Sequence, residues 1–222
     1  MADAAIIFDV DGVLLELTRA EEDLFFHPFA KRCDAERLSR DWNSYKIRND
    51  ENIVAELVER HALPASDKIE IRDEYLALLQ NQLSGNHIAS PSIEGAAELL
   101  QHFAARAKLG IATANFREAA RLRLEHSGLW SPVAKHAFGA DGGGHKHEIL
   151  GRALSSLPLP KSRIVYIGDN LNDVEAGLKH GVHFIGFSTS PNRLKNLMQA
   201  GAKHVSSNHT TTAGLIKTLL QL

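Results

Sequence analysis

The sequence of 222 residues contains a single cysteine, Cys33, so no intramolecular disulfide can form. It has no extended basic block and a formal net charge of -2, which argues against nucleic-acid binding as its main role. No apolar run approaches the length of a membrane span, and no basic segment followed by an apolar stretch opens the chain. These absences predict a cytoplasmic protein with neither a nucleic-acid nor a membrane partner.

The stretch that organises the chain is a short apolar run, Ala4 to Phe8, followed by Asp9, Asp11 and Gly12. Such a run is typical of a buried strand in a parallel sheet. Along an extended backbone the side chains of Asp9 and Asp11 point the same way. Two converging carboxylates call for a cation, and Mg2+ suits oxygen ligands. The alternative is that the pair merely begins a turn, since Asp and Gly are common turn formers.

Residues 16–90 have helical patterns and no convincing strand. Helices are expected over 21–31, from an N-terminus at 49–51, and from Ser66 to a stop at Gly85. We expect the last of these helices to turn Ile69, Leu76, Leu79 and Leu83 inward. The segment is therefore predicted to be an all-helical unit inserted after the first strand.

From Pro91 onward, predicted strands and helices alternate. Strands are expected over 109–113, 163–167, 183–187 and 205–206, and helices over 94–108, 117–126, 148–157, 173–180, 191–200 and 211–220. This alternation indicates a parallel sheet with helices on both faces. We therefore predict a three-layer, Rossmann-like α/β core from residues 1–15 and 91–222, with the helical unit over 16–90.

Polar residues of catalytic type follow the predicted strands. Asp9 and Asp11 follow the first strand, Thr113 ends the next and Asp169 follows a later one. Because the carboxyl ends of parallel strands share one edge, these side chains are expected to lie together. Lys146, in the glycine-rich loop 139–146, is expected to add an ammonium group to the same site.

With these residues in place, the sequence resembles the haloacid dehalogenase-like hydrolase superfamily, in its helical-cap, phosphoglycolate phosphatase-like subgroup. The resemblance rests on four motifs in order, which are Phe8 to Leu14, Ile111 to Thr113, Lys146, and Ile167 to Asp173. The helical unit stands where that family carries its cap. The sequence departs from the subgroup's pattern at Leu15-Glu16-Leu17, at Ala114 after the threonine, and at His147 after the lysine.

The resemblance implies a Mg2+-dependent phosphatase that hydrolyses a small phosphorylated metabolite through an aspartyl-phosphate. It implies that Asp9 is the nucleophile and that the Asp11 side chain is the general acid and base. Mg2+ would be held by Asp9, the backbone carbonyl of Asp11, Asp169 and Asp173. A monomer or a homodimer is expected.

The remaining implied roles concern the substrate. Thr113, with the nearby amides of Gly12, Ala114 and Asn115, would hold phosphoryl oxygens, and Lys146 would balance charge on the nucleophile and the phosphate. In the cap, Arg48 is expected to contact the substrate.

Several alternatives remain open from the residues. A phosphomutase of the same fold would return the phosphoryl group to a sugar. A non-catalytic binding protein should have lost one of Asp9, Asp11, Lys146 or Asp169, and none of them is missing. Asp173 could serve only a helix N-terminus. His145 and His147 could bind zinc, although no third ligand is nearby in the sequence.

Overall fold

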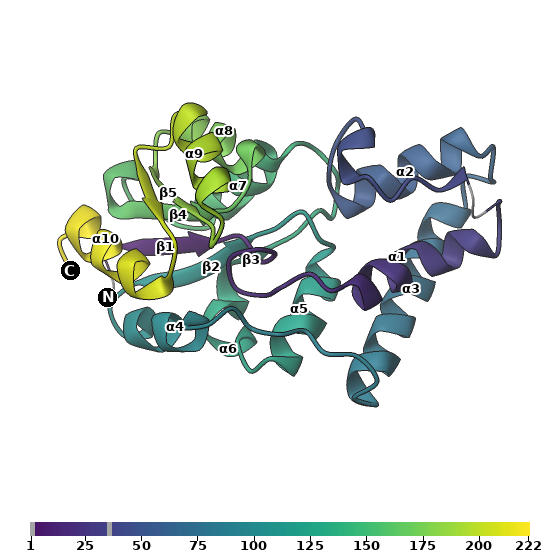
Figure 1. The fold of residues 1–222 in the computed structure, drawn as a ribbon, viewed down its shortest axis with the longest axis horizontal. Helices are drawn as coiled ribbons and strands as arrows, with labels where there is room; N and C mark the ends of the chain where they lie inside the picture. Colours follow the sequence, from purple (N-terminus) through teal and green to yellow (C-terminus); the bar gives the residue numbers. More distant parts are fainter. Residues whose placement is uncertain (1–2, 35–36) are drawn as a thin grey trace.

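The computed structural model describes residues 3–34 and 37–222. Its strands are β1 (Ala5–Phe8), β2 (Lys108–Ala112), β3 (Ala137–Phe138), β4 (Ile164–Gly168), β5 (His183–Phe187) and β6 (His204–Ser206). They form a six-stranded, all-parallel sheet in the order β3-β2-β1-β4-β5-β6 (Figure 1). β1 lies in the middle, between β2 and β4, and all of its residues are buried. This central position explains why the first strand is apolar throughout.

Helices cover both faces of the sheet. They are α4 (Ala96–Ala104), α5 (Arg117–His126), α6 (Trp130–Val133), α7 (Lys146–Ser155), α8 (Leu171–His180), α9 (Pro191–Gln199) and α10 (His209–Leu220). Helices α4, α5, α6 and α10 share one apolar cluster with the sheet, and α7, α8 and α9 share the other. The predicted three-layer α/β core is thus confirmed. None of the helices among the described residues has both the length and the apolar character needed to cross a membrane.

A helical cap extends beyond the carboxyl edge of the sheet (Figure 1). It contains α1 (Arg19–Ala30), α2 (Asp50–Arg60) and α3 (Asp67–Ser84). These helices bury a cluster rich in aromatic side chains, including Phe25, Phe29 and Tyr75. The inserted all-helical cap is as predicted, whereas the boundaries at 16 and 90 stay predictions. Met1 and Ala2 of the predicted core, and Ala35 and Glu36 of the predicted cap, lie outside the described residues.

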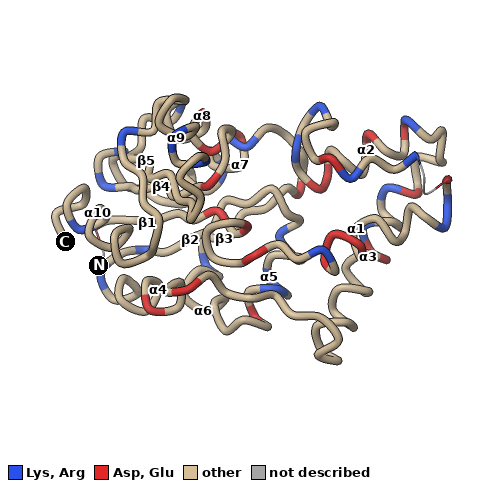
Figure 2. Tube along the Cα trace, viewed as in Figure 1, with Lys and Arg blue, Asp and Glu red and all other residues tan. Residues whose placement is uncertain are grey.

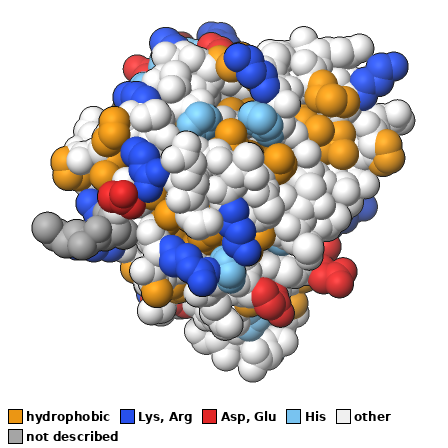
Figure 3. All heavy atoms as spheres, turned by 90° about the vertical axis from the view of Figure 1, so that its left-hand side faces the viewer, with side chains coloured by type: hydrophobic (Ala, Val, Ile, Leu, Met, Phe, Trp, Pro, Cys, Tyr) orange, Lys and Arg blue, Asp and Glu red, His pale blue; other side chains and the backbone are white. Residues whose placement is uncertain are grey.

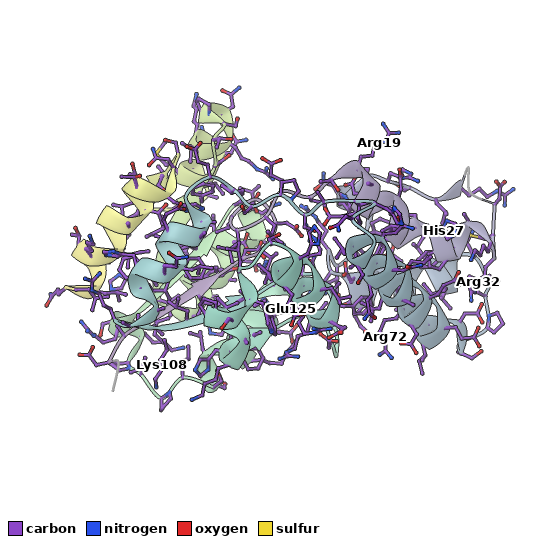
Figure 4. All side chains as sticks on the ribbon, turned by 90° about the horizontal axis from the view of Figure 1, so that it is seen from below. Arg19, His27, Arg32, Arg72, Lys108 and Glu125 are labelled. Atoms are coloured by element: carbon purple, nitrogen blue, oxygen red, sulfur yellow. The ribbon has the colours of Figure 1, made fainter. Side chains whose placement is uncertain are left out.

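Helix α5 packs against both units. Its residues Ala120 and Leu124 belong to a core cluster, whereas Ala119 and Leu122, with Phe116 just before the helix, belong to the cap cluster. Figure 4 shows Glu125 of α5 beside the cap, where Arg72 lies on α3 and Arg32 follows the end of α1, and Lys108 at the far end of the sheet. One helix therefore has two apolar faces, each covered by a different unit.

The prediction that Ile69 faces inward is wrong, because its side chain is 60% exposed. The buried residues of α3 are Ile71, Tyr75, Leu79 and Leu83, spaced four apart along the face that meets α1 and α5. The sequence did not reveal β3 or α6 either, because two- and four-residue elements are too short to show a period.

Candidate functional site

Acidic positions gather at the edge of the sheet that faces the cap (Figure 2). Asp9 follows β1, Thr113 follows β2 and Asp169 follows β4, and these three strands are neighbours. Because the strands are parallel, their carboxyl ends meet at this edge, as predicted. The Asp9 N–H donates to the Ile167 carbonyl at 2.8 Å, which extends the ladder one residue beyond β1 and fixes where the Asp9 side chain begins.

Three carboxylates form the centre of the site. Asp9, Asp169 and Asp173 each offer a carboxylate oxygen, and these oxygens all lie within 4.8 Å of one another. Asp9 and Asp169 are each 7% exposed, and Asp173 is fully buried. Like charges at this separation and burial repel strongly unless a cation lies among them.

The pKa values of these acids reflect that environment. Burial raises the pKa of Asp9 well above its ordinary value, Lys146 opposes this, and Asp173 and Asp169 reinforce it. Burial, reinforced by Asp173, raises the pKa of Asp169 to about 7. Both carboxyls therefore need positive charge nearby to remain ionised at neutral pH.

Lys146 supplies one buried positive charge. It is the first residue of α7 rather than a loop residue, and its Nζ lies 2.8 Å from Asp9 Oδ1 and 3.0 Å from Asp173 Oδ1. Burial alone would lower the pKa of Lys146, but Asp173 and Asp9 raise it, so the side chain stays an ammonium. It therefore links the candidate nucleophile to the acid of α8.

Asp173 has two sets of partners. Its Oδ2 accepts from the Asn170 N–H at 3.1 Å in a capping box at the start of α8, as the helix-terminus alternative requires. Its Oδ1 accepts from the Tyr166 hydroxyl at 2.5 Å and lies beside the Lys146 ammonium. The helix cap thus fixes Asp173 in the carboxylate group.

Gly12 allows the loop after β1 to approach Asp169. Its φ is +74°, which favours glycine, and a Cβ at this position would lie 2.3 Å from Asp169 Oδ2. Any larger residue would displace that carboxylate. Arg193 contacts the same oxygen from α9 at 3.3 Å and is half exposed.

The loop after β2 contributes Thr113, Ala114 and Asn115, which all line the cavity described below. Thr113 is 1% exposed, and its Oγ1 accepts from the Asn115 N–H at 3.2 Å. The Asn115 side-chain amide donates to Asp11 Oδ2 at 2.9 Å. The Asp11 side chain lies outside the three-carboxylate group and forms an ion pair with Arg123, 2.8 Å from Oδ1. The metal-binding role of its backbone carbonyl stays a prediction.

A cavity of about 380 Å³ lies between this edge and the cap. Core residues such as Asp9 and Thr113 line its floor, and Phe25, Trp42 and Tyr75 line it from the cap. A space of this size is at the small end of ligand pockets.

Arg48 lines the same cavity from the cap. One of its terminal nitrogens donates to Asn43 Oδ1 at 3.0 Å, whereas its Nε is buried without a partner. A buried donor without a partner is costly. A ligand oxygen that accepts from this nitrogen would therefore favour binding of the ligand.

Asp50 is a buried acid that the sequence analysis did not single out. Its backbone N–H donates to the Ala114 carbonyl at 2.9 Å, and its Oδ2 accepts from the Phe116 N–H at 2.7 Å. The first residue of α2 is thus tied to the loop after β2. Burial raises the pKa of Asp50 to about 7, although the bond from Phe116 opposes the shift.

We expect the Asp50→Asn variant to change the pH dependence of stability. Because the folded-state pKa is about 7 and the ordinary value is 3.8, Asp50 favours folding below pH 4 and loses that contribution as pH rises to 7. Over this window the free energy of unfolding of the wild type should fall relative to the variant by up to about 4 kcal/mol. Urea denaturation between pH 4 and 8 measures the difference. The exposed Asp73→Asn substitution is the control, and a pH-independent difference for Asp50→Asn would contradict the expectation.

The zinc alternative for His145 and His147 gains no third ligand. Their rings stack at 5.6 Å, and His147 Nε2 lies 2.7 Å from Lys179 Nζ. Across residues 3–34 and 37–222, the only clustered metal-type ligands are the three aspartates described above.

The model of the haloacid dehalogenase-like hydrolase family matches residues 6–187, from β1 to the end of β5. The chain belongs to this family. A comparison of the hydrolase with curated proteins gave no match.

Solved structures share the fold of this hydrolase. CbbY from Rhodobacter sphaeroides in complex with phosphate is 22% identical, with a TM-score of 0.74 and 100% of each chain covered. A CbbY mutant in complex with xylulose-1,5-bisphosphate is 21% identical, with a TM-score of 0.70, covering 94% of this chain and 95% of that chain. A HAD family hydrolase from Deinococcus radiodurans R1 with bound phosphate and sodium is 23% identical, with a TM-score of 0.61, covering 98% of this chain and 96% of that chain.

A divalent cation fits the carboxylate group of this haloacid dehalogenase-like hydrolase. Three buried carboxylates face one buried cation, Lys146, and the half-exposed Arg193. Their oxygen atoms are the ligands that hard cations such as Mg2+ prefer.

The opposite end of the hydrolase differs in its charge, because basic and histidine side chains are scattered over it with fewer acidic ones (Figure 3).

Proposed function

We propose that this hydrolase is a Mg2+-dependent phosphatase that hydrolyses a small phosphorylated metabolite through an aspartyl-phosphate on Asp9. The observation that carries the proposal is the group of three buried carboxylates with Lys146. Asp9, Asp169 and Lys146 of this group line the cavity between the sheet edge and the cap. The similar structures with bound phosphate or xylulose-1,5-bisphosphate support a phosphate ester as substrate.

In this proposal Asp9 attacks phosphorus in line, and the leaving oxygen departs with a proton from Asp11. Water then attacks the aspartyl-phosphate, gives its proton to Asp11 and releases inorganic phosphate. Mg2+, held by Asp9, Asp169, Asp173 and the backbone carbonyl of Asp11, would offset the repulsion between carboxylate and phosphate.

Other groups hold the phosphoryl oxygens. The Thr113 hydroxyl and the amides of Gly12, Ala114 and Asn115 are candidate donors at the sheet edge. The backbone N–H groups of Gly12 and Asn115 already donate to the Leu15 carbonyl and to Thr113 Oγ1, so both would have to exchange these partners for a phosphoryl oxygen. Lys146 would neutralise charge on Asp9 and on the transferring group, because its ammonium already lies 2.8 Å from Asp9.

The cap is proposed to select the substrate. The cavity volume of about 380 Å³ favours a small ester. The Arg48 Nε, buried without a partner, would donate to an oxygen of the leaving group.

The test is inorganic phosphate release from the full chain over a panel of small phosphate esters, with Mg2+ or with EDTA and without an added bisphosphate. We expect release with Mg2+, loss with EDTA and recovery when Mg2+ is restored. The Asp9→Asn variant, prepared identically, reports contaminating phosphatase. Isomerised product without phosphate release would contradict the proposal in favour of a mutase. Ester binding without turnover would contradict it in favour of a binding protein.

A further inference from the structure

Arg123 is a buried cation outside the carboxylate group. It lies on α5, is 2% exposed and lines the cavity. Its guanidinium reaches Asp11 Oδ1 at 2.8 Å, Glu21 Oε1 at 2.7 Å, Asn115 Oδ1 at 3.0 Å and the Glu16 carbonyl at 3.2 Å. A buried arginine with four different partners has a fixed position, because its donors form a rigid fork.

Both oxygens of Asp11 are held from this position. Arg123 contacts Oδ1, and the Asn115 amide donates to Oδ2 at 2.9 Å. Arg123 also donates to Asn115 Oδ1, which fixes the orientation of that amide so that its nitrogen points at Asp11. The three side chains form a closed triangle in which each oxygen of the Asp11 carboxylate has its own contact.

Glu21 anchors Arg123 where the chain passes between the two units. The Thr18 N–H and hydroxyl both donate to Glu21 Oε2 at 2.9 Å, and the Ser90 hydroxyl donates to Oε1. Thr18 precedes α1, and Ser90 lies on the segment that returns from α3 to the core. The Arg123–Glu21 pair thus connects both crossing segments to Asp11.

We propose that Arg123 is a positioning residue that, anchored by Glu21, aims the Asp11 carboxyl at the leaving-group oxygen. The proposal rests on the proposed function, in which Asp11 transfers its proton to that oxygen as the phosphorus–oxygen bond breaks. Arg123 contacts the side chain of Asp11 and not the carboxylates of Asp9, Asp169 and Asp173.

The pKa of the leaving group separates this role from a merely structural one. An alkyl oxide leaves poorly without a proton, whereas p-nitrophenolate leaves without one. If Asp11 is no longer held in position, the hydrolysis of alkyl phosphates therefore slows selectively. Loss of fold or of the metal site slows both classes of substrate alike.

The experiment compares kcat/KM for the best alkyl phosphate of the panel and for p-nitrophenyl phosphate. Arg123→Lys is expected to lose about 10²-fold or more on the alkyl ester and less than about 10-fold on the aryl ester. Arg121→Lys, on the same helix but paired with Glu118 and Glu125 at the surface, is the control and should leave both values unchanged.

Two further variants keep the test decisive. If Arg123→Lys does not fold, the double variant Glu21→Met with Arg123→Met removes the two most deeply buried charges together and leaves only the partly exposed Asp11 without its cation. It should show the same selectivity. Adding Arg123→Lys to Asp11→Asn should cause no further loss. Equal losses of kcat/KM on both substrates would overturn the inference. Additive losses when Arg123→Lys is combined with Asp11→Asn would overturn it as well. Absence of turnover by the wild type on both substrates would instead refute the proposed function, and this inference with it.

Discussion

Replacing Asp9 by Asn should abolish turnover while leaving the fold intact. An amide is a far poorer nucleophile than a carboxylate, so we expect a loss of at least about 10³-fold in kcat. The fold should survive because burial and the neighbouring acids already disfavour the charge of Asp9, and Lys146 keeps its contact with Asp173 at 3.0 Å.

Phosphate release and circular dichroism measure the two halves of this expectation. Acid quench during turnover of a substrate with a labelled phosphoryl group should trap a phosphorylated chain in the wild type. The label should lie on the peptide that contains Asp9, and the variant should carry none. Asp73→Asn makes the same chemical change at an exposed position of α3 and should behave as the wild type. Substantial turnover by Asp9→Asn, or a label on another peptide, would contradict the assignment of Asp9 as the nucleophile.

The Lys146→Met variant is expected to lose both activity and stability. Methionine keeps much of the length of lysine but leaves Asp9 and Asp173 without their shared cation. Breaking a buried ion pair on one side costs about 3–5 kcal/mol of unfolding free energy. Removing one preorganised charge from a site of this kind lowers kcat by about 10²–10³-fold.

Urea denaturation with EDTA or with excess Mg2+ separates the two effects. We expect Mg2+ to restore part of the stability of Lys146→Met, because a bound cation replaces some of the missing positive charge. Activity should not return to the wild-type value. Lys179→Met, at an exposed position of α8, is the matched control. A variant as stable as the wild type in EDTA would show that Lys146 does not offset the repulsion among the acids.

Sequence periodicity was sufficient for five of the six strands and most of the helices, because buried apolar strands and capped helices carry strong local signals. It misplaced the start of α7, since residues 142–144 suggested a loop that continues through Lys146. It also misjudged Ile69, because an apolar residue in the first turn of a helix matches the pattern even where no partner covers it.

The strand-end residues Asp9, Thr113 and Asp169 were predictable, since parallel strands bring their carboxyl ends together. The partners of Asp11 were not predictable, because Asn115 lies 104 residues away along the chain and Arg123 lies further still. Both contacts depend on tertiary packing. A signal was nevertheless present. Arg123 lies three and four positions after the buried Ala120 and Ala119, so a charged residue occupies an inward position of α5.

The sharing of α5 between two apolar clusters constrains attempts to exchange caps among relatives. A cap taken without this helix would lose the surface formed by Phe116, Ala119 and Leu122, and the recipient core would expose a foreign one. A working chimaera would therefore have to carry α5 along with the transplanted helices, although α5 lies well downstream of them in the chain.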